Sequence, residues 1–159
     1  MAPIEASFDD HFTVKAPMDR VREHFASAEQ VARHYGKLDR YELRDPHTVR
    51  FVQPSYNYGV TRFDGRYTCR YQVVDDHTVR WSTLPEDHNM ENTGTARLSP
   101  GPGGSTLLHY QATLAIDLDV NRILRATLAP VVSRIVAEEM RGYVKRMIAT
   151  VEAAATART

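Results

Sequence analysis

The C-terminal part of the sequence most limits what this chain can fold into, because it carries one long apolar stripe at helical spacing. From Pro130 onward, apolar residues recur every three or four positions, and charged residues fill the opposite side. We predict a helix over residues 119–155, with a kink expected at Pro130, whose ring removes one helical N–H donor. A fully buried large side chain contributes roughly 1.5–3 kcal/mol, so the helix needs an apolar partner surface. The stripe consists of Val132, Ile135, Val136, Met140, Tyr143, Val144, Met147, Ile148 and Val151.

The partner surface is predicted in residues 38–117, where apolar and polar residues alternate as in an antiparallel sheet with one solvated face. Another strand is predicted at residues 7–14, followed by two short helices within residues 17–36. Helices segregated from consecutive strands are typical of an α+β domain. We therefore predict one domain over residues 1–159, in which a curved antiparallel sheet of about seven strands grips the long C-terminal helix.

Composition narrows the functional classes. The 159 residues suit one domain, and 20 basic residues balance 20 acidic ones, which argues against a nucleic-acid partner. Cys69 is the single cysteine, so no intrachain disulfide is expected and a cytoplasmic location is favoured. The N-terminal residues lack the basic start and apolar core of a signal peptide. No apolar run is long enough for a transmembrane segment. Both a monomer and a homodimer are compatible with the sequence.

The chain resembles the START-like helix-grip superfamily, also called SRPBCC, over nearly its whole length. The resemblance is carried by FTVKAP at residues 12–17, VREHF at residues 21–25, and AIDLD at residues 115–119 before the terminal helix. This superfamily includes polyketide cyclases and aromatases, lipid-transfer domains and plant allergens. The resemblance implies a cavity between the sheet and the terminal helix that holds an apolar or amphipathic ligand.

The predicted inner faces carry more polar-tipped side chains than a dry core needs. A buried carboxylate requires a partner, so Asp10 and Glu139 are the candidate catalytic residues. Two simpler alternatives are that Asp10 lies at the sheet rim and that Glu139 pairs with a surface arginine such as Arg122. The histidines show no recognised metal-binding spacing, so we expect no metal and no cofactor. The predicted ligand-binding residues are Asp10, Phe12, Phe63, Tyr67, Tyr71, Trp81, Asn92, Tyr110, Glu139 and Tyr143.

Several segments allow two interpretations. Residues 120–128 suit either a flexible lid or the first turns of the terminal helix. Tyr56 and Tyr58, in a predicted loop at residues 54–59, suit either a gate or rings that pack back on the sheet. Gly65 and Gly94 lie inside predicted strands, where bending of the sheet around the helix is the simplest explanation.

Two functions from different classes follow. The first is non-catalytic binding of a small hydrophobic or amphipathic molecule in an aromatic-lined cavity. The second is a cyclase, aromatase or dehydratase acting on a polyketide-like substrate, with Glu139 or Asp10 as general base, its pKa raised by burial, and Tyr67 or Tyr110 polarising a carbonyl. A protein-partner module, using an apolar patch near residues 120–128, is a third alternative.

Overall fold

The computed structural model describes residues 3–59 and 61–157, which form an α+β fold. Strand β1 (Ile4–Val14) leads into two short helices, α1 (Met18–Ala26) and α2 (Ala28–His34). Strands then follow one another up to the long helix α3 (Arg122–Thr156). These strands are β2 (Arg40–Asp45), β3 (Thr48–Val52), β4 (Tyr56–Asn57), β5 (Arg62–Phe63), β6 (Arg66–Asp75), β7 (Thr78–Thr83), β8 (Met90–Pro100) and β9 (Thr106–Ile116), with the short 3-10 helix η1 (Pro102–Gly104) before β9.

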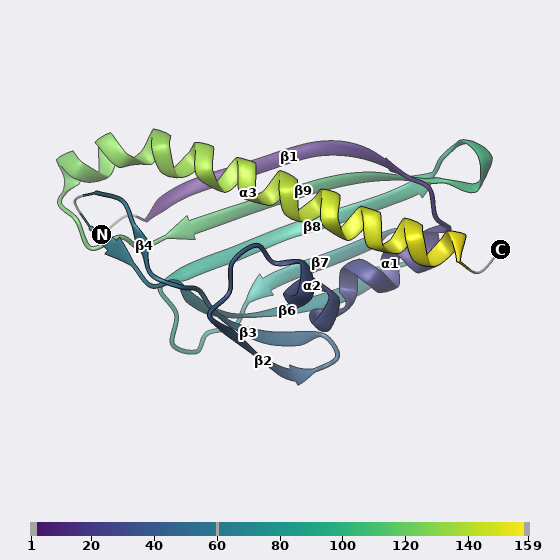
Figure 1. Cartoon of the computed structure of the whole chain (residues 1–159), viewed down its shortest axis with the longest axis horizontal. Coiled ribbons are helices and arrows are strands. Elements are labelled where there is room, and N and C mark those ends of the chain that lie inside the picture. Colours follow the sequence, from purple (N-terminus) through teal and green to yellow (C-terminus); the bar gives the residue numbers. More distant parts are fainter. Residues whose placement is uncertain (1–2, 60, 158–159) are drawn as a thin grey trace.

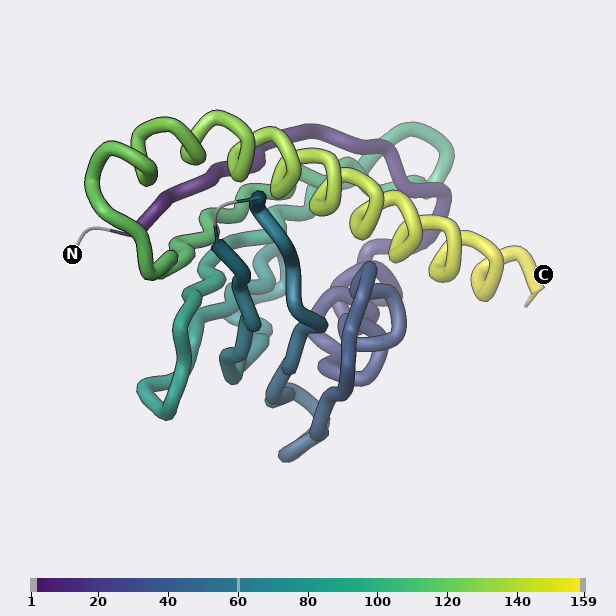
Figure 2. Tube along the Cα trace, turned by 60° about the vertical axis from the view of Figure 1, so that its left-hand side comes forward, coloured from purple at the N-terminus to yellow at the C-terminus, as the bar shows by residue number. Residues whose placement is uncertain are grey.

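Seven strands form one antiparallel sheet, as predicted, and their order is β1-β9-β8-β7-β6-β3-β2. Figures 1 and 2 show this sheet curving beneath α3, which lies across one face along β1. Helices α1 and α2 pack on the same side, under the C-terminal half of α3. The face that these helices cover is therefore the inner face, and the opposite face is open to solvent.

Helix α3 buries the predicted apolar stripe. Eight of its nine members are buried, and Ile135 is half-buried. The side chain of Asn121 caps the helix by accepting a hydrogen bond from the backbone N–H of Leu124 at 2.9 Å. The helix continues through Pro130 without interruption. Residues 122–128 are its first turns, which is one of the two predicted alternatives.

The strand prediction needs two corrections. Residues 54–59 contain β4, which pairs with β5 in a separate two-stranded sheet. The predicted strand that contains Gly65 is interrupted at Asp64 and Gly65, between β5 and β6. A Cβ atom on Gly65 would collide with the side chain of Gln53 and lie 2.9 Å from Sδ of Met90, so close packing explains this glycine.

Gly94 has a related role in β8. A Cβ atom there would collide with the indole of Trp81 and with the backbone oxygen of Gln111. Gly94 therefore makes room for Trp81 on the neighbouring strand β7, which the bending interpretation did not anticipate. None of the helices in the described residues is long and apolar enough to cross a membrane.

Candidate functional site

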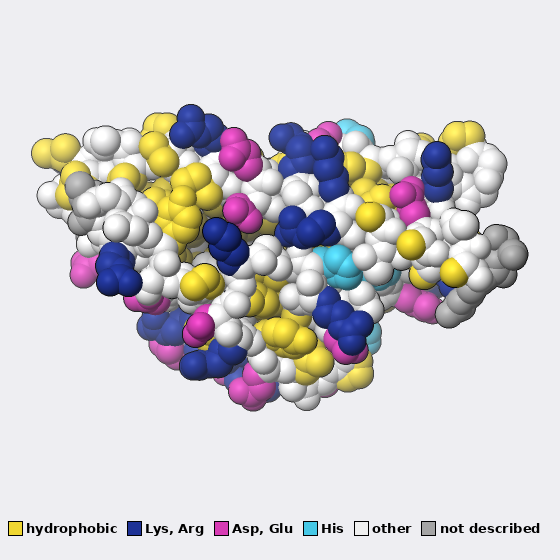
Figure 3. Space-filling model, in the orientation of Figure 1, with side chains coloured by type: hydrophobic (Ala, Val, Ile, Leu, Met, Phe, Trp, Pro, Cys, Tyr) yellow, Lys and Arg dark blue, Asp and Glu magenta, His cyan; other side chains and the backbone are white. Residues whose placement is uncertain are grey.

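A cavity of about 390 Å³ lies between the inner face of the sheet and α3. Its walls are mostly apolar, with contributions from Met90, Leu114 and Ile116 of the sheet and Ile135 and Met140 of α3. This volume lies within the range of pockets that hold drug-sized molecules. Figure 3 shows hydrophobic side chains gathered beneath the first half of α3, bordered by charged groups.

Six of the ten predicted ligand-binding residues line this cavity. Three of them come from β6, β8 and β9, where alternation and the antiparallel register place them on one face, and the others come from β5 and α3. The predicted residues that line the cavity are Phe63, Tyr71, Asn92, Tyr110, Glu139 and Tyr143.

Four predicted residues do not line this cavity. Tyr67 and Trp81 are buried behind the wall, at 0% and 2% exposure. Phe12 is half-buried and borders a second hollow, which also involves Leu98 and Leu108. Asp10 lies at the rim of edge strand β1, where its carboxylate is 3.6 Å from the guanidinium of Arg141. Arg141 is itself half-exposed. The position of Asp10 therefore matches the simpler alternative, in which Asp10 lies at the sheet rim.

Glu139 lines the cavity but is exposed at its mouth. Its carboxylate lies against Gly36, where a Cβ atom would be 2.8 Å from Oε2. Lys37 lines the same mouth with the opposite charge. The burial expected to activate Glu139 as a general base is therefore absent, because Glu139 is exposed.

A chain of hydrogen bonds supports the cavity wall from behind. The Trp81 indole N–H donates to Oδ1 of Asn92 at 2.9 Å, and Nδ2 of Asn92 donates to the Tyr67 hydroxyl at 3.4 Å. The hydroxyls of Tyr67 and Tyr35 are 2.8 Å apart, and Nε2 of Gln53 donates to Tyr35 at 2.6 Å. Because the indole can only donate, it fixes the orientation of the Asn92 amide.

This series of hydrogen bonds leaves the proton of one tyrosine hydroxyl without an acceptor. Both hydroxyls already accept an amide N–H, and one proton is shared between them. Tyr67 is fully buried, so it is best satisfied when it donates to Tyr35. Tyr35 lines the cavity, and its own proton is then available to a ligand. Burial raises the pKa of Tyr35 to about 12, so this proton is retained at neutral pH.

Sequence reasoning missed Tyr35 and Gln53. Neither residue belongs to a motif, and only the fold brings both to Tyr67. The contribution of Tyr56, in β4, and of Tyr58, which follows β4, was partly anticipated. Tyr56 and Tyr58 line the cavity, and their ring centroids are 4.5 Å apart.

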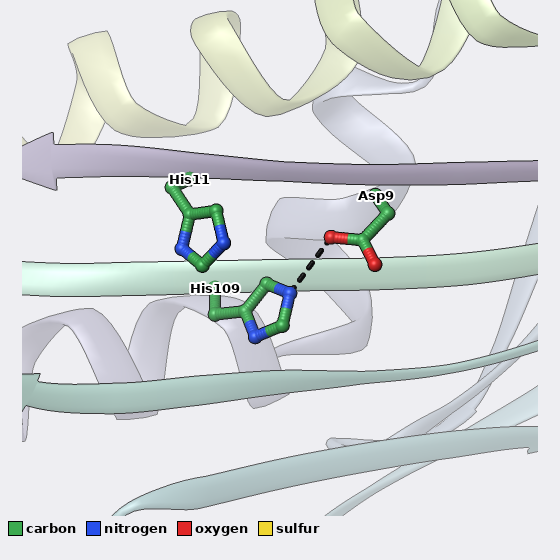
Figure 4. Close-up of side chains that lie close together, drawn as sticks. All are labelled: Asp9, His11 and His109. Atoms are coloured by element: carbon green, nitrogen blue, oxygen red, sulfur yellow. Dashed lines mark hydrogen bonds and ion pairs between the residues drawn. The ribbon is translucent and has the colours of Figure 1, made fainter.

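A second group of polar side chains lies on the outer face of the sheet, away from the cavity. Asp9 and His11 on β1 meet His109 on β9 (Figure 4). Their potential ligand atoms all lie within 4.8 Å of one another. We expected no metal site because the histidines show no metal-binding spacing along the sequence. The pairing of β1 with β9 nevertheless brings these two histidines and Asp9 together.

Comparison with known proteins identifies a matching family and solved structures with a similar fold. A family model described as polyketide cyclase / dehydrase and lipid transport matches residues 5–152. Among solved structures, TTHA0849 from Thermus thermophilus is 20% identical, with a TM-score of 0.68 over 93% of this chain and 98% of that one. Comparison with curated protein sequences gave no match.

Two further structures share the fold. The Zhui aromatase/cyclase from a Streptomyces species is 14% identical, with a TM-score of 0.65 over 93% of this chain and 94% of that one. A START superfamily protein from Mycobacterium smegmatis is 13% identical, with a TM-score of 0.61 over 96% of this chain and 99% of that one. At these identities the similarity concerns the fold alone.

Proposed function

The chain belongs to the polyketide cyclase / dehydrase and lipid transport family, and from this premise we propose that it binds one small hydrophobic or amphipathic molecule in the cavity between the sheet and α3. The observation that carries the proposal is an apolar cavity of about 390 Å³ with a hydroxyl donor, Tyr35, in its wall. Such sites combine a mostly apolar lining with a few placed polar groups.

The lining suggests how the ligand lies. Its apolar body contacts Met90, Leu114 and Met140, and a carbonyl or hydroxyl oxygen accepts the free proton of Tyr35. A charged or strongly polar end lies at the mouth, where Lys37 and Glu139 are exposed to water. An amphipathic molecule fits this arrangement better than a pure hydrocarbon, because it satisfies the Tyr35 donor.

Native mass spectrometry of freshly purified protein tests the proposal first. We expect an additional mass of a few hundred daltons that is released on denaturation. The same ligand is then titrated into the emptied protein, with fluorescence of Trp81, the single tryptophan, as the signal. Because Trp81 reaches the cavity wall through Asn92, its emission is expected to change on binding.

The Tyr35→Phe variant tests the role of the free hydroxyl. One hydrogen bond contributes about 0.5–1.5 kcal/mol, so we expect affinity to fall about three- to tenfold. Tyr41→Phe, on the exposed strand β2, is the matched control and should leave affinity unchanged. Equal affinities for wild type and Tyr35→Phe would contradict the assigned donor.

A cyclase, aromatase or dehydratase reaction is the second candidate. It is favoured by one observation, namely that the Glu139 carboxylate and the Tyr35 hydroxyl line the same cavity. In this case Glu139 removes a proton while Tyr35 polarises a carbonyl. Glu139→Gln should then lower turnover about a hundredfold or more while ligand affinity is retained. If the protein only binds its ligand, Glu139→Gln should leave the affinity unchanged, and neither wild type nor the variant should show turnover.

A further inference from the structure

The outer face of the sheet carries a compact cluster that the proposed ligand cavity does not use. It consists of Asp9 and His11, two residues apart on β1, and His109 on β9, and we call these three residues the outer-face triad. Residues two apart on a strand point to the same side. His11 and His109 are direct partners in the antiparallel register, so three potential metal ligands lie side by side.

The contacts within the triad are close. The imidazole rings of His11 and His109 are stacked, with centroids 4.1 Å apart and planes inclined by 12°. Nε2 of His109 lies 2.7 Å from Oδ1 of Asp9. Figure 4 shows both rings and the carboxylate lying over the same stretch of β9.

Asp9 is held in place by a neighbour. Nε2 of Gln111, the residue paired with Asp9 on β9, donates a hydrogen bond to Oδ2 at 2.9 Å. The Asp9 carboxylate thus has one oxygen beside Nε2 of His109 and the other bound by Gln111. An anchored carboxylate beside imidazoles is the arrangement in which outer hydrogen bonds orient metal ligands.

We propose that the outer-face triad binds one divalent transition-metal cation of the Zn²⁺ class. Two imidazoles and one carboxylate suit Zn²⁺, Ni²⁺ or Cu²⁺, whereas Mg²⁺ and Ca²⁺ require sites built largely from oxygen ligands. On binding, His109 coordinates through Nε2 and carries its proton on Nδ1. The cation then takes the place of the hydrogen bond between His109 and Asp9.

The surroundings of the outer-face triad determine its affinity for a cation. Three protein ligands leave a coordination position for water, and β1 is an edge strand, so this position is open. Arg97 on β8 is paired with His109 and lines the same hollow as His11 and His109, where its positive charge opposes a cation. We therefore expect affinity in the micromolar range. A bound cation would link edge strand β1 to β9.

Calorimetric titration of the full-length protein with ZnCl₂ tests the proposal. Wild type is expected to bind one Zn²⁺ per chain, whereas MgCl₂ gives no binding heat. His11→Asn and His109→Asn should each weaken Zn²⁺ binding at least tenfold. The matched control is His88→Asn, because His88 is also close to a carboxylate, with Nε2 3.3 Å from Oε1 of Glu91, but among the described residues it belongs to no group of three potential metal ligands. His88→Asn should bind Zn²⁺ with the same affinity as wild type.

A second measurement does not depend on binding heat. CoCl₂ bound by the triad should give visible absorption bands that His109→Asn abolishes, and far-ultraviolet circular dichroism verifies that each variant is folded. The proposal is overturned if folded wild-type protein binds no Zn²⁺, or if His11→Asn and His109→Asn bind it as tightly as wild type.

Discussion

His24 should make the packing of α1 against α3 sensitive to acid. Its ring is partly buried, and Nε2 is shielded from water with no hydrogen-bond partner in the part of the chain that the structure describes. Burial, and then the neighbouring imidazole of His34, lower the pKa of His24 to about 4 from the usual 6.5. The ring centroids of the two histidines are 5.7 Å apart.

The direction and size of the effect follow from proton linkage. Below about pH 6.5 the unfolded chain binds a proton at His24, while the folded protein resists this until about pH 4. Acidification across this window therefore stabilises the unfolded state. A pKa difference of about 2.5 corresponds to about 3.4 kcal/mol as an upper bound. Because the ring keeps some contact with solvent, we expect about 2 kcal/mol.

Urea unfolding at about pH 7 and about pH 4.5 measures this contribution. His24→Phe removes the titrating group while keeping an aromatic ring beside Phe25. Carboxylates such as Asp45 and Asp75, whose lowered pKa values also reduce stability in acid, contribute equally to both proteins. Wild type should therefore lose about 2 kcal/mol more than His24→Phe. His88→Asn is the control and should lose as much stability as wild type. Equal losses of stability by wild type and His24→Phe would refute the assignment.

Three other perturbations test the packing. Gly94→Ala should destabilise the protein by about 1–3 kcal/mol in urea unfolding, since the new Cβ collides with Trp81; a neutral result would contradict that packing. Thr106→Val should cost about 1–2 kcal/mol, because the buried Thr106 hydroxyl donates to the Ala16 carbonyl at 2.8 Å, whereas half-exposed Thr113→Val should change stability little. Burial raises the pKa of Cys69 to about 12, so a thiol reagent should label it at neutral pH only as fast as the protein opens, and rapid labelling of native protein would contradict its burial.

The architecture was predictable because its strongest signals are periodic. The stripe on α3 and the alternation along the strands each determine which side of an element is buried, and the order of elements then leaves few arrangements. Ser27 followed three residues later by Gln30 is the sequence pattern of a capping box, and Oγ of Ser27 accepts a hydrogen bond from the Gln30 N–H at 3.3 Å. The interruption at Gly65 was not visible, because the alternation continues through it.

The candidate site was only partly predictable. Alternation identifies the inner face of a strand but does not say how far a residue lies from an edge. Asp10 and Tyr110 are register partners, yet Asp10 lies on the edge strand at the rim and Tyr110 lines the cavity. Helical spacing placed Glu139 beside the stripe, but it does not determine which segment packs over that turn of α3, and Glu139 is exposed.

The outer-face triad shows a different limit of sequence reasoning. His11 and His109 lie in distant strands, and their pairing depends on the register between β1 and β9. A register shifted by one residue would place one of the two rings on the inner face. Spacing along the chain therefore carries no signal for this group.

The most direct test of the central claim is whether filling the cavity abolishes binding of an apolar molecule. Ile135→Trp places an indole in the cavity from α3, whereas Val131→Trp places the same group at a 39% exposed position outside the lining. The fluorescent apolar anion 1-anilinonaphthalene-8-sulfonate is titrated into folded wild type and both variants. We expect one tight site in wild type and Val131→Trp, and its loss in Ile135→Trp. Equal binding by all three proteins, or no binding by wild type, would contradict a ligand cavity between the sheet and α3.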